Sequence, residues 1–568
     1  MRDGILLNAA VYMPKGETLA LPTVIEATPY GIDRLHNAGV AFARAGIAMV
    51  ACDVRGRGDS GGQFSMWVNE PADIHDIVSW AAAQPWSNGK VGLYGSSYTG
   101  ANQWMALKEK PSALKTIVPA GTSMSGYDMP MGGIANAHGI IWGILTSGKP
   151  TYWNLFASPG FWTETLTALH SQHDSLAALP GLLGIEHPDF LEQVEMPAWG
   201  PNWEAYLPSA ADLKAVDFPI LTITGQYDSA QIGTLENWRR FDAFAPEQAQ
   251  EFGHLIIGPW AHGGMEGSDR VGELQLGAAA QTDIFQTKID WYHWTLGHGS
   301  KPSFLEDRVR YYLCGRETWH VAPDVASVSG EDQVYYLTST GRADDVFHSG
   351  SLCAEIARAG SDQFVIDLDD PKKTALEREQ RPDSAGLGAT YSVPFPPPYH
   401  SMFSALYGDD PTDQGFSTDL QGMGVIYHSK QLQADASFAG RPTLDIWLQM
   451  DVEDADICVF IHEIRRDGTA VLLSSNLLRL RYRSGWDKEV FARPGRAFEV
   501  NLCDFRFFAR TLMAGSRLRL TIRAVSGLNF ERNDKTVQPD GQRIAHVSLL
   551  HGPDTPSRLT IPIWQASA

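Results

Sequence analysis

Residues 91–100 combine an apolar run, a turn of small residues and the start of a helical pattern. They read Val-Gly-Leu-Tyr-Gly-Ser-Ser-Tyr-Thr-Gly. In a nucleophile elbow a serine occupies a sharp turn from a strand to a helix, where its neighbours must be small and backbone N–H groups can stabilise an oxyanion. Ser97 fits this position, although Thr99 stands where the strict Gly-x-Ser-x-Gly pattern has its second glycine and Gly100 follows one residue later. The alternative is an ordinary strand, turn and helix in which the serines act as helix caps.

A serine hydroxyl needs an imidazole to take its proton, and the imidazole needs a carboxylate that orients it. Asp228 follows the apolar run 219–224 and a glycine turn, and His262 follows the apolar run 254–257. A single aspartate after a strand is usually a turn former, and among 17 histidines any one is weak evidence. Serine, acid and histidine in this order, each at the end of a strand, match the α/β-hydrolase arrangement. The sequence therefore predicts a triad of Ser97, Asp228 and His262.

Further motifs accompany the triad along the chain. They are Met1-Arg-Asp-Gly4, Ala27-Thr-Pro-Tyr-Gly31, Asp53-Val-Arg-Gly-Arg-Gly-Asp-Ser-Gly-Gly62, Gly95-Ser-Ser-Tyr-Thr-Gly100, Gly225-Gln-Tyr-Asp228, Gly258-Pro-Trp-Ala-His262 and Gly527-Leu-Asn-Phe-Glu-Arg-Asn533. This set resembles the CocE/NonD (cocaine esterase-like) hydrolases of the X-Pro dipeptidyl-peptidase (S15) superfamily over almost the whole chain. The resemblance implies a Gly-x-Ser-Tyr-x-Gly elbow and the same triad. It also implies an oxyanion hole built from the Tyr98 backbone N–H and the Tyr30 hydroxyl.

The position of Tyr30 in the chain supports this role independently. Tyr30 follows the apolar run 23–27, and the loop after such a strand supplies the second oxyanion donor in these folds. The loop has no His-Gly-Gly-Gly sequence to offer backbone donors, so a side-chain donor is needed. The alternative is a tyrosine whose ring packs beneath neighbouring helices.

The elements that must position these residues alternate between strand and helix. Short apolar runs at 23–27, 47–53, 91–94 and 114–119 are separated by helical patterns at 72–83 and 101–108, and the alternation resumes after residue 213. This pattern predicts a sheet covered by helices on both faces. The expected fold is α/β: an α/β-hydrolase core (1–122 and 213–305) with an inserted helical cap (123–212), followed by a C-terminal β jelly-roll domain (306–568).

The predicted cap is rich in aromatic residues and short helical pieces. We expect Trp142, Trp153, Phe161 and Trp162 to form an apolar wall of the substrate pocket, with ordinary core packing as the alternative for each. We expect the acidic residues of the cap to lie mainly on a solvated helical face. They are Asp128, Glu164, Asp174, Glu186, Asp189, Glu192 and Glu195.

After residue 309 the apolar runs alternate without intervening helices, as in 333–337, 443–448, 458–464 and 517–522, and this predicts the jelly roll. Residues 366–424 are predicted to form a long irregular connection. Residues 451–456 (Asp-Val-Glu-Asp-Ala-Asp) resemble a calcium loop but lack the glycine that an EF-hand needs, so we expect a solvated strand end. Residues 53–58 are expected to form a structural turn beside the active site.

Composition excludes several classes of partner. With 45 basic and 66 acidic side chains the net charge is −21, which disfavours nucleic acid and anionic lipid. No apolar run approaches the roughly 18 residues that a membrane span needs, and no signal-peptide pattern opens the sequence, so the cytoplasm is the default compartment. The 5 cysteines are scattered, without a Cys-x-x-Cys pair, and are expected to be mostly buried thiols. Neither a cofactor nor a metal is expected, and a homo-oligomer is left open.

These observations predict a serine hydrolase that cleaves a small-molecule carboxylic ester or amide through an acyl-enzyme. The alternatives are an α-amino acid ester hydrolase or β-lactam acylase, an X-Pro dipeptidyl peptidase-like enzyme, and an acyltransferase that uses the same triad. A carbohydrate-binding jelly-roll protein with an inactive core is the non-enzymatic alternative.

Overall fold

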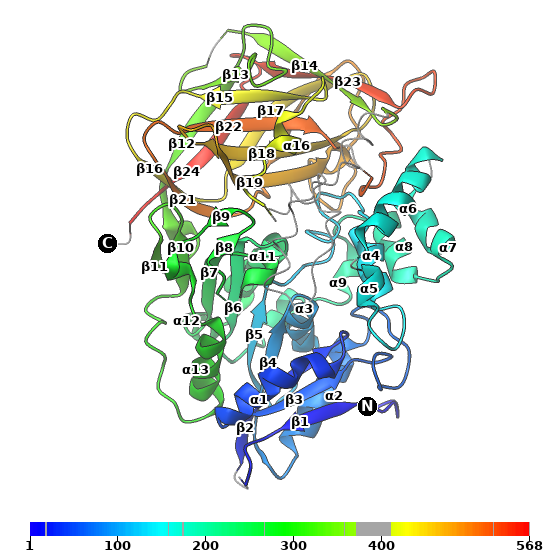
Figure 1. The fold of residues 1–568 in the computed structure, drawn as a ribbon, viewed down its shortest axis with the longest axis vertical. Coiled ribbons are helices and arrows are strands. Elements are labelled where there is room, and N and C mark those ends of the chain that lie inside the picture. The colour runs from blue at the N-terminus through cyan, green and yellow to red at the C-terminus, as the bar shows by residue number, and fades with distance from the viewer. Residues whose placement is uncertain are drawn as a thin grey trace.

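The computed structural model describes residues 1–16, 20–156, 158–172, 175–265, 267–356, 358–370, 410–525 and 528–566. These residues form two large β-sheets and a group of helices beside them (Figure 1). The predicted irregular connection at 366–424 falls largely outside the described residues, which end at 370 and resume at 410. No described helix has the length and hydropathy that a membrane span requires.

The first sheet has nine strands in the order β1-β3-β2-β4-β5-β6-β7-β10-β11. They are β1 (Ala9–Tyr12), β2 (Leu21–Thr28), β3 (Ala48–Asp53), β4 (Ser87–Ser96), β5 (Leu114–Ala120), β6 (Leu221–Tyr227), β7 (His254–Ala261), β10 (Val309–Leu313) and β11 (Thr318–Ala322). The strands from β3 to β10 are parallel, and only β1 and β11 pair antiparallel at the edges. Because parallel strands are covered on both faces, they are buried along most of their length, as their apolar sequences predict.

Helices cover both faces of this sheet. On one face α2 and α11 pack against side chains such as Ile25 and Val50, and on the other α1 and α13 pack against Val24 and Met49. The helices of the core are α1 (His36–Arg44), α2 (Glu70–Ala82), α3 (Tyr98–Met105), α11 (Gln231–Phe244), α12 (Glu247–Glu251) and α13 (Ile284–Leu296). Neighbouring residues of one strand thus contact opposite helical layers, which confirms the predicted doubly covered sheet.

The strand predicted to open the jelly roll belongs to the first sheet instead. β10 pairs parallel with β7 and antiparallel with β11, so the sheet extends to Ala322 rather than ending before residue 306. The reason is that β10 finds a free edge beside β7, where Val309 lies opposite Leu255.

The cap lies between β5 and β6 in the chain and beside both sheets in space (Figure 1). Its core contains Ile140, Ile144, Trp162, Leu166 and Phe190. Its helices are α4 (His138–Leu145), α5 (Trp153–Phe156), α6 (Pro159–Ser171), α7 (Leu179–Leu183), α8 (Pro188–Glu195), α9 (Pro201–Glu204) and α10 (Ala210–Leu213).

The C-terminal domain is β-rich, and its strands are connected by pairing into a 13-stranded set. They are β12 (Ser329–Thr338), β13 (Gly350–Cys353), β14 (Gly360–Asp367), β15 (Gly424–Ser429), β16 (Ala436–Gly440), β17 (Thr443–Met450), β18 (Asp456–Ile464), β19 (Ala470–Arg479), β20 (Ala497–Leu502), β21 (Phe508–Leu512), β22 (Arg517–Ala524), β23 (Ile544–His551) and β24 (Arg558–Trp564). Alternate residues of β17 and of β18, which are not paired with each other, meet in one apolar core. Two layers therefore face one another, as in a β-sandwich.

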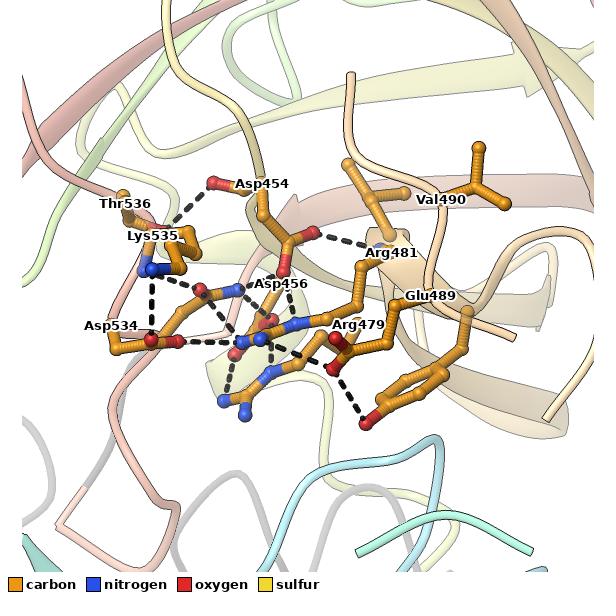
Figure 2. A network of polar contacts seen from close by, with 12 residues as sticks. Asp454, Asp456, Arg479, Arg481, Glu489, Val490, Asp534, Lys535 and Thr536 are labelled. Atoms are coloured by element: carbon orange, nitrogen blue, oxygen red, sulfur yellow. Dashed lines mark hydrogen bonds and ion pairs between the residues drawn. The ribbon is translucent and has the colours of Figure 1, made fainter. Parts of the chain in front are cut away.

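The calcium-like segment 451–456 is not a solvated strand end. Asp454 and Asp456 are buried, at 0% and 4% exposure. Arg481 donates to Asp454 at 2.7 Å, and Arg479 donates to both oxygens of Asp456 at 2.9 and 3.0 Å (Figure 2). The Asn533 amide donates to both carboxylates. The two acids therefore fix the 529–533 turn by ion pairs and hydrogen bonds.

The C-terminal domain also bonds to the chain around the predicted acid. The Gln226 amide donates to the carbonyl of Tyr312 at 2.6 Å and accepts from the N–H of Ala509 at 2.8 Å. Gln231 donates to the carbonyl of Phe507 at 2.9 Å and accepts from its N–H at 2.7 Å. Both glutamines flank Asp228, so the strand that begins at Phe508 supports its loop.

Candidate active site

Ser97 lies at the turn between β4 and α3 with φ 60° and ψ −123°. Such a positive φ is unfavourable for a residue with a side chain and is typical of a nucleophile elbow. The turn is held because the Ser97 N–H donates to the carbonyl of Ala120 at 2.9 Å, while the N–H groups of Gly100 and Ala101 donate to the carbonyl of Ser97. The local hydrogen bonds thus offset the strain at the serine.

The two glycines of the elbow are required by close approach of the chain. A Cβ on Gly95 would lie 2.2 Å from the Thr99 hydroxyl, and a Cβ on Gly100 would lie 2.6 Å from a methyl carbon of Thr122 and 2.7 Å from the carbonyl oxygen of Ala120. Thr99, at the position of the second glycine in the strict pattern, bonds through its hydroxyl to Glu26 and to Ser96. The glycine is therefore needed at 100, where α3 crosses β5, and not at 99.

Asp228 and His262 follow β6 and β7, which are adjacent in the sheet. His262 Nδ1 and Asp228 Oδ1 are 2.7 Å apart. The same oxygen accepts the N–H of Ala230 at 2.9 Å, and Oδ2 accepts the hydroxyl of Thr224 at 2.8 Å. Because the carboxyl ends of β4, β6 and β7 lie at one edge of the sheet, the three predicted triad residues share that edge.

The Asp228 carboxylate is fully buried, yet it is held in its charged form. Burial favours the protonated acid, but His262 and the hydrogen bonds from Ala230 and Thr224 outweigh it, and the pKa of Asp228 lies below its usual value. A charged carboxylate on Nδ1 leaves Nε2 of His262 as the nitrogen able to take a proton.

Tyr30 lies on the loop after β2, as predicted. Its hydroxyl accepts the indole N–H of Trp142 at 3.1 Å and interacts with the side chain of Ser97. Burial raises the pKa of Tyr30 to about 12, although the Trp142 and Ser97 hydrogen bonds act in the opposite direction. The phenol therefore keeps its proton near neutral pH and can donate it to an oxyanion.

The loop that carries Tyr30 is fixed by a buried arginine. Arg57 is 0% exposed and donates to the carbonyls of Pro29 and Thr146, each at 2.8 Å, and to the hydroxyl of Thr151 at 3.3 Å. Thr151 in turn donates to the carbonyl of Tyr30 at 3.0 Å. Residues 53–58 thus form the structural turn that the sequence predicts, and they join the Tyr30 loop to the end of α4.

The side chain of Tyr98 points into an aromatic cluster. Its ring is stacked between Trp67 and Trp142, with centroids 5.7 and 5.5 Å away and interplanar angles of 24° and 14°. Its hydroxyl donates to the buried carboxyl group of Glu70. Burial raises the pKa of Glu70 to about 7, against the effect of this hydrogen bond. Tyr98, the residue after Ser97, is therefore held at its hydroxyl group by Glu70.

The four aromatic residues predicted as a pocket wall fall into two groups. Trp142 and Trp153 lie beside Tyr30, with ring centroids 6.4 and 6.2 Å from its ring. Trp162 is fully buried in the core of the cap, where its N–H bonds to a carbonyl of α5, and the 36% exposed Phe161 packs edge-on against it. The structure brings the first pair to Tyr30 and places the second pair in the packing of the cap itself.

The acidic residues of the cap differ from the predicted solvated face at two positions. Glu164, Glu186 and Glu195 are exposed, as expected, Glu192 is half-buried, and Asp174 lies outside the described residues. Asp128, however, is buried, and its oxygens accept the N–H groups of Met124 and Gly233. Asp189 accepts from Ser65 and Met66 of the core. These two acids are therefore structural acceptors.

Sequence reasoning missed the roles of Glu70 and Arg57 and the proximity of His138. Glu70 opens α2, where an acidic residue is ordinarily a solvated partner of the helix dipole. His138 opens α4 and interacts with His262; burial and His262 together lower the pKa of His138 to about 4. No sequence pattern marks Glu70 or His138, because each is buried by segments that are distant in the chain.

The described residues contain one cluster that satisfies the geometry for a metal ion. It consists of Asp344, Asp345 and His348 in the C-terminal domain. Arg342 pairs with both aspartates, and His348 pairs with Asp345. Ion pairs within the cluster account for its arrangement.

Family profiles match both halves of the chain. The profile described as X-Pro dipeptidyl-peptidase (S15 family) matches residues 3–264, and that of the X-Pro dipeptidyl-peptidase C-terminal non-catalytic domain matches residues 304–560. The chain belongs to the X-Pro dipeptidyl-peptidase (S15) family. Among curated relatives of this S15 protein, the cocaine esterase of Rhodococcus sp. (strain MB1 Bresler) is 25% identical, over 99% of this chain and 97% of its own.

Solved structures share the fold of this S15 hydrolase over its full length. An aminopeptidase from the marine sediment archaeon Thaumarchaeota archaeon has a TM-score of 0.81 and 20% identity, covering 100% of this chain and 95% of its own. An α-amino acid ester hydrolase has a TM-score of 0.77 and 19% identity, covering 99% of this chain and 95% of its own. These likenesses confirm the expected hydrolase core followed by a β-rich domain.

Proposed function

We propose that this S15 hydrolase cleaves carboxylic esters through an acyl-enzyme formed on Ser97. The Ser97 oxygen attacks the ester carbonyl carbon while its proton passes to Nε2 of His262. When the tetrahedral intermediate collapses, that proton goes to the leaving alcohol. Water then repeats the sequence on the acyl-enzyme, with His262 again as base, and releases the acid.

The contact between His262 and Asp228 carries this proposal. The 2.7 Å hydrogen bond engages Nδ1, and the same carboxylate also accepts hydrogen bonds from Ala230 and Thr224. A buried carboxylate that is held in place by a backbone N–H and a hydroxyl can orient the imidazole and stabilise the imidazolium.

The developing oxyanion has two donors in this proposal. The N–H of Tyr98 belongs to the first turn of α3, where it has no partner within the helix, and the Tyr30 hydroxyl interacts with Ser97 from the opposite loop. Removing one such donor typically lowers kcat by about 10² to 10³.

The surroundings of Tyr30 favour an uncharged acyl group. Apolar rings are supplied here by Phe64, Trp142 and Trp153. The guanidinium of Arg34 lies over the ring of Trp153, 4.1 Å from its centroid. An ammonium taken out of water requires a carboxylate. Three buried acids lie near this region, and each already accepts a hydrogen bond: Glu26 from the Thr99 hydroxyl, Glu70 through one oxygen from the Tyr98 phenol, and Asp128 from backbone N–H groups. We therefore expect aromatic or medium-length acyl esters without a free ammonium group.

Two measurements test the proposal. For hydrolysis of a p-nitrophenyl ester, kcat should fall by at least about 10⁴ in Ser97→Ala, and retention of a tenth of the activity would exclude Ser97 as nucleophile.

The methyl ester of phenylacetate should be cleaved at least as efficiently as that of phenylglycine, which differs in its ammonium group. A tenfold preference for phenylglycine, about 1.4 kcal/mol, would reverse the substrate assignment.

A further inference from the structure

The hydroxyl oxygen of Tyr30 receives one hydrogen bond from a side chain of the cap. The donor is the indole N–H of Trp142, 3.1 Å away. The two rings are nearly perpendicular, at 86°, so the edge of the indole faces the phenol. The indole nitrogen of Trp142 therefore contacts the hydroxyl of Tyr30, which is the group proposed to bind the oxyanion.

An indole N–H only donates, whereas a phenol donates and accepts. Trp142 can fill a lone pair of the Tyr30 oxygen but cannot take its proton. The phenol O–H is thereby left for another acceptor, and the Ser97 side chain interacts with the same phenol. A donated hydrogen bond also polarises the phenol and strengthens the bond that it donates, since hydrogen bonds in a chain reinforce one another.

The plane of the Trp142 indole is set by Tyr98. The two rings are stacked 5.5 Å apart at 14°, and Tyr98 is held on its other face by Trp67 and at its hydroxyl by Glu70. Tyr98 also provides the backbone N–H of the proposed oxyanion hole. One aromatic stack therefore connects the two proposed donors.

The helix that carries Trp142 is fixed from the C-terminal domain. Just before α4, the Ala137 N–H donates to the carbonyl of Asn529 at 2.7 Å, and the Glu531 N–H donates to the carbonyl of Ala135 at 2.8 Å. The 529–533 turn is held in turn by the buried ion pairs of Figure 2. The position of the indole thus depends on contacts outside the substrate pocket.

We infer that Trp142 is a positioning residue that acts through Tyr30, directing and strengthening the phenol as an oxyanion donor. This inference rests on the proposed role of Tyr30. It separates Trp142 from an ordinary apolar wall, which would contact the acyl group in the ground state and the transition state alike and would change KM rather than kcat.

The test is Trp142→Phe, which keeps a ring for the stack and removes the N–H. Loss of one neutral hydrogen bond, about 1 kcal/mol, should lower kcat by about fivefold to tenfold, with KM changed by less than about twofold. In a Tyr30→Phe background the same change should cost less than about twofold, because its target is gone. Trp203→Phe is the matched control, since Trp203 also donates a buried N–H to a carbonyl within the cap, at 3.1 Å.

An equal loss in both backgrounds, or a rise in KM with kcat unchanged, would overturn the inference, as would a similar loss of kcat in Trp203→Phe. If Tyr30→Phe costs less than about tenfold, the inference and the Tyr30 assignment both fall, while an inactive Ser97→Ala would still support the triad. Trp142→Met provides a second variant without the N–H should the phenylalanine variant fail to fold. Inhibition by a phenylboronate, whose adduct with a serine is tetrahedral, should weaken in parallel with kcat.

Discussion

Asp228→Asn is a sharp test of the proposed triad, because the surrounding bonds decide how the new amide lies. At the Oδ1 position the amide oxygen can accept both the Ala230 N–H and the His262 N–H. The amide NH₂ group in that place would face the fixed N–H of Ala230. It must therefore point to Thr224, whose hydroxyl can rotate from donor to acceptor. His262 should keep its proton on Nδ1.

The expected loss follows from the charge alone. Unit charges about 4 Å apart at an effective dielectric constant of about 20 attract by about 4 kcal/mol, and a neutral hydrogen bond retains about 1 kcal/mol of this. The remaining loss of about 3 kcal/mol corresponds to about 10² in kcat. A substitution that reverses the imidazole tautomer lowers kcat by about 10⁴, as in the serine protease for which this loss was measured.

The pH profile provides the second readout. The interaction that lowers the pKa of Asp228 must equally favour the protonated form of His262. Without the charge the imidazole binds a proton less readily, so the acid limb of kcat/KM should move to lower pH by at least about one unit. Both quantities come from p-nitrophenyl ester hydrolysis between pH 5 and 9.

A loss of 10⁴ or more in Asp228→Asn would mean that the amide lies the other way and the hydrogen-bond argument fails. An acid limb that stays in place, or moves to higher pH, would mean that Asp228 does not act as a charged partner of His262. Adding Thr224→Val, which removes the acceptor for the amide group, should lower the activity further.

Two predictions concern stability. Arg479→Met should lower the free energy of unfolding by about 3 to 5 kcal/mol, because it leaves the Asp456 carboxylate buried without its guanidinium. Arg558→Met, which breaks a more exposed ion pair, should change it by less than about 1 kcal/mol in the same urea titration, and equal effects would contradict the reasoning. Burial lowers the pKa of His254 to about 4, so the unfolded chain binds the proton first as pH falls and stability declines below about pH 6.5. Between pH 7 and 5 the free energy of unfolding should fall by about 2 kcal/mol less in His254→Gln than in the unmodified protein. If the two proteins lose stability equally over this range, His254 is not the cause of the decline.

The parts of the fold that depend on local sequence were predictable. The buried parallel strands are short apolar runs bounded by glycine or proline, and β2, β3 and β5 coincide with them to within two residues. The candidate triad followed from the same pattern, because side chains just beyond parallel strands gather at one edge of the sheet. The Asp228–His262 bond agrees with that expectation.

The local sequence of a strand does not show which strand it pairs with, and the prediction that residues 309–313 open the jelly roll was wrong for this reason. The pattern of β10 suits a strand of either sheet, and only the presence of β7 decides where it pairs. Burial of polar side chains is equally non-local. Arg57 and Glu70 look like surface residues in the chain, and they become buried because α4 and α3 close over them.

The bonds from Gln226 and Gln231 to the C-terminal domain have a consequence for evolutionary divergence. Their partners are main-chain groups of residues 507 and 509, not side chains. These hydrogen bonds therefore do not depend on which side chains stand at 507 and 509, although Phe507 and Ala509 are both buried in the core. Recombination between distant relatives would keep these bonds wherever the backbone at the start of β21 is preserved. A chain cut after residue 322 would instead remove the N–H groups of residues 507 and 509 that bond to the two amide oxygens beside the proposed catalytic acid.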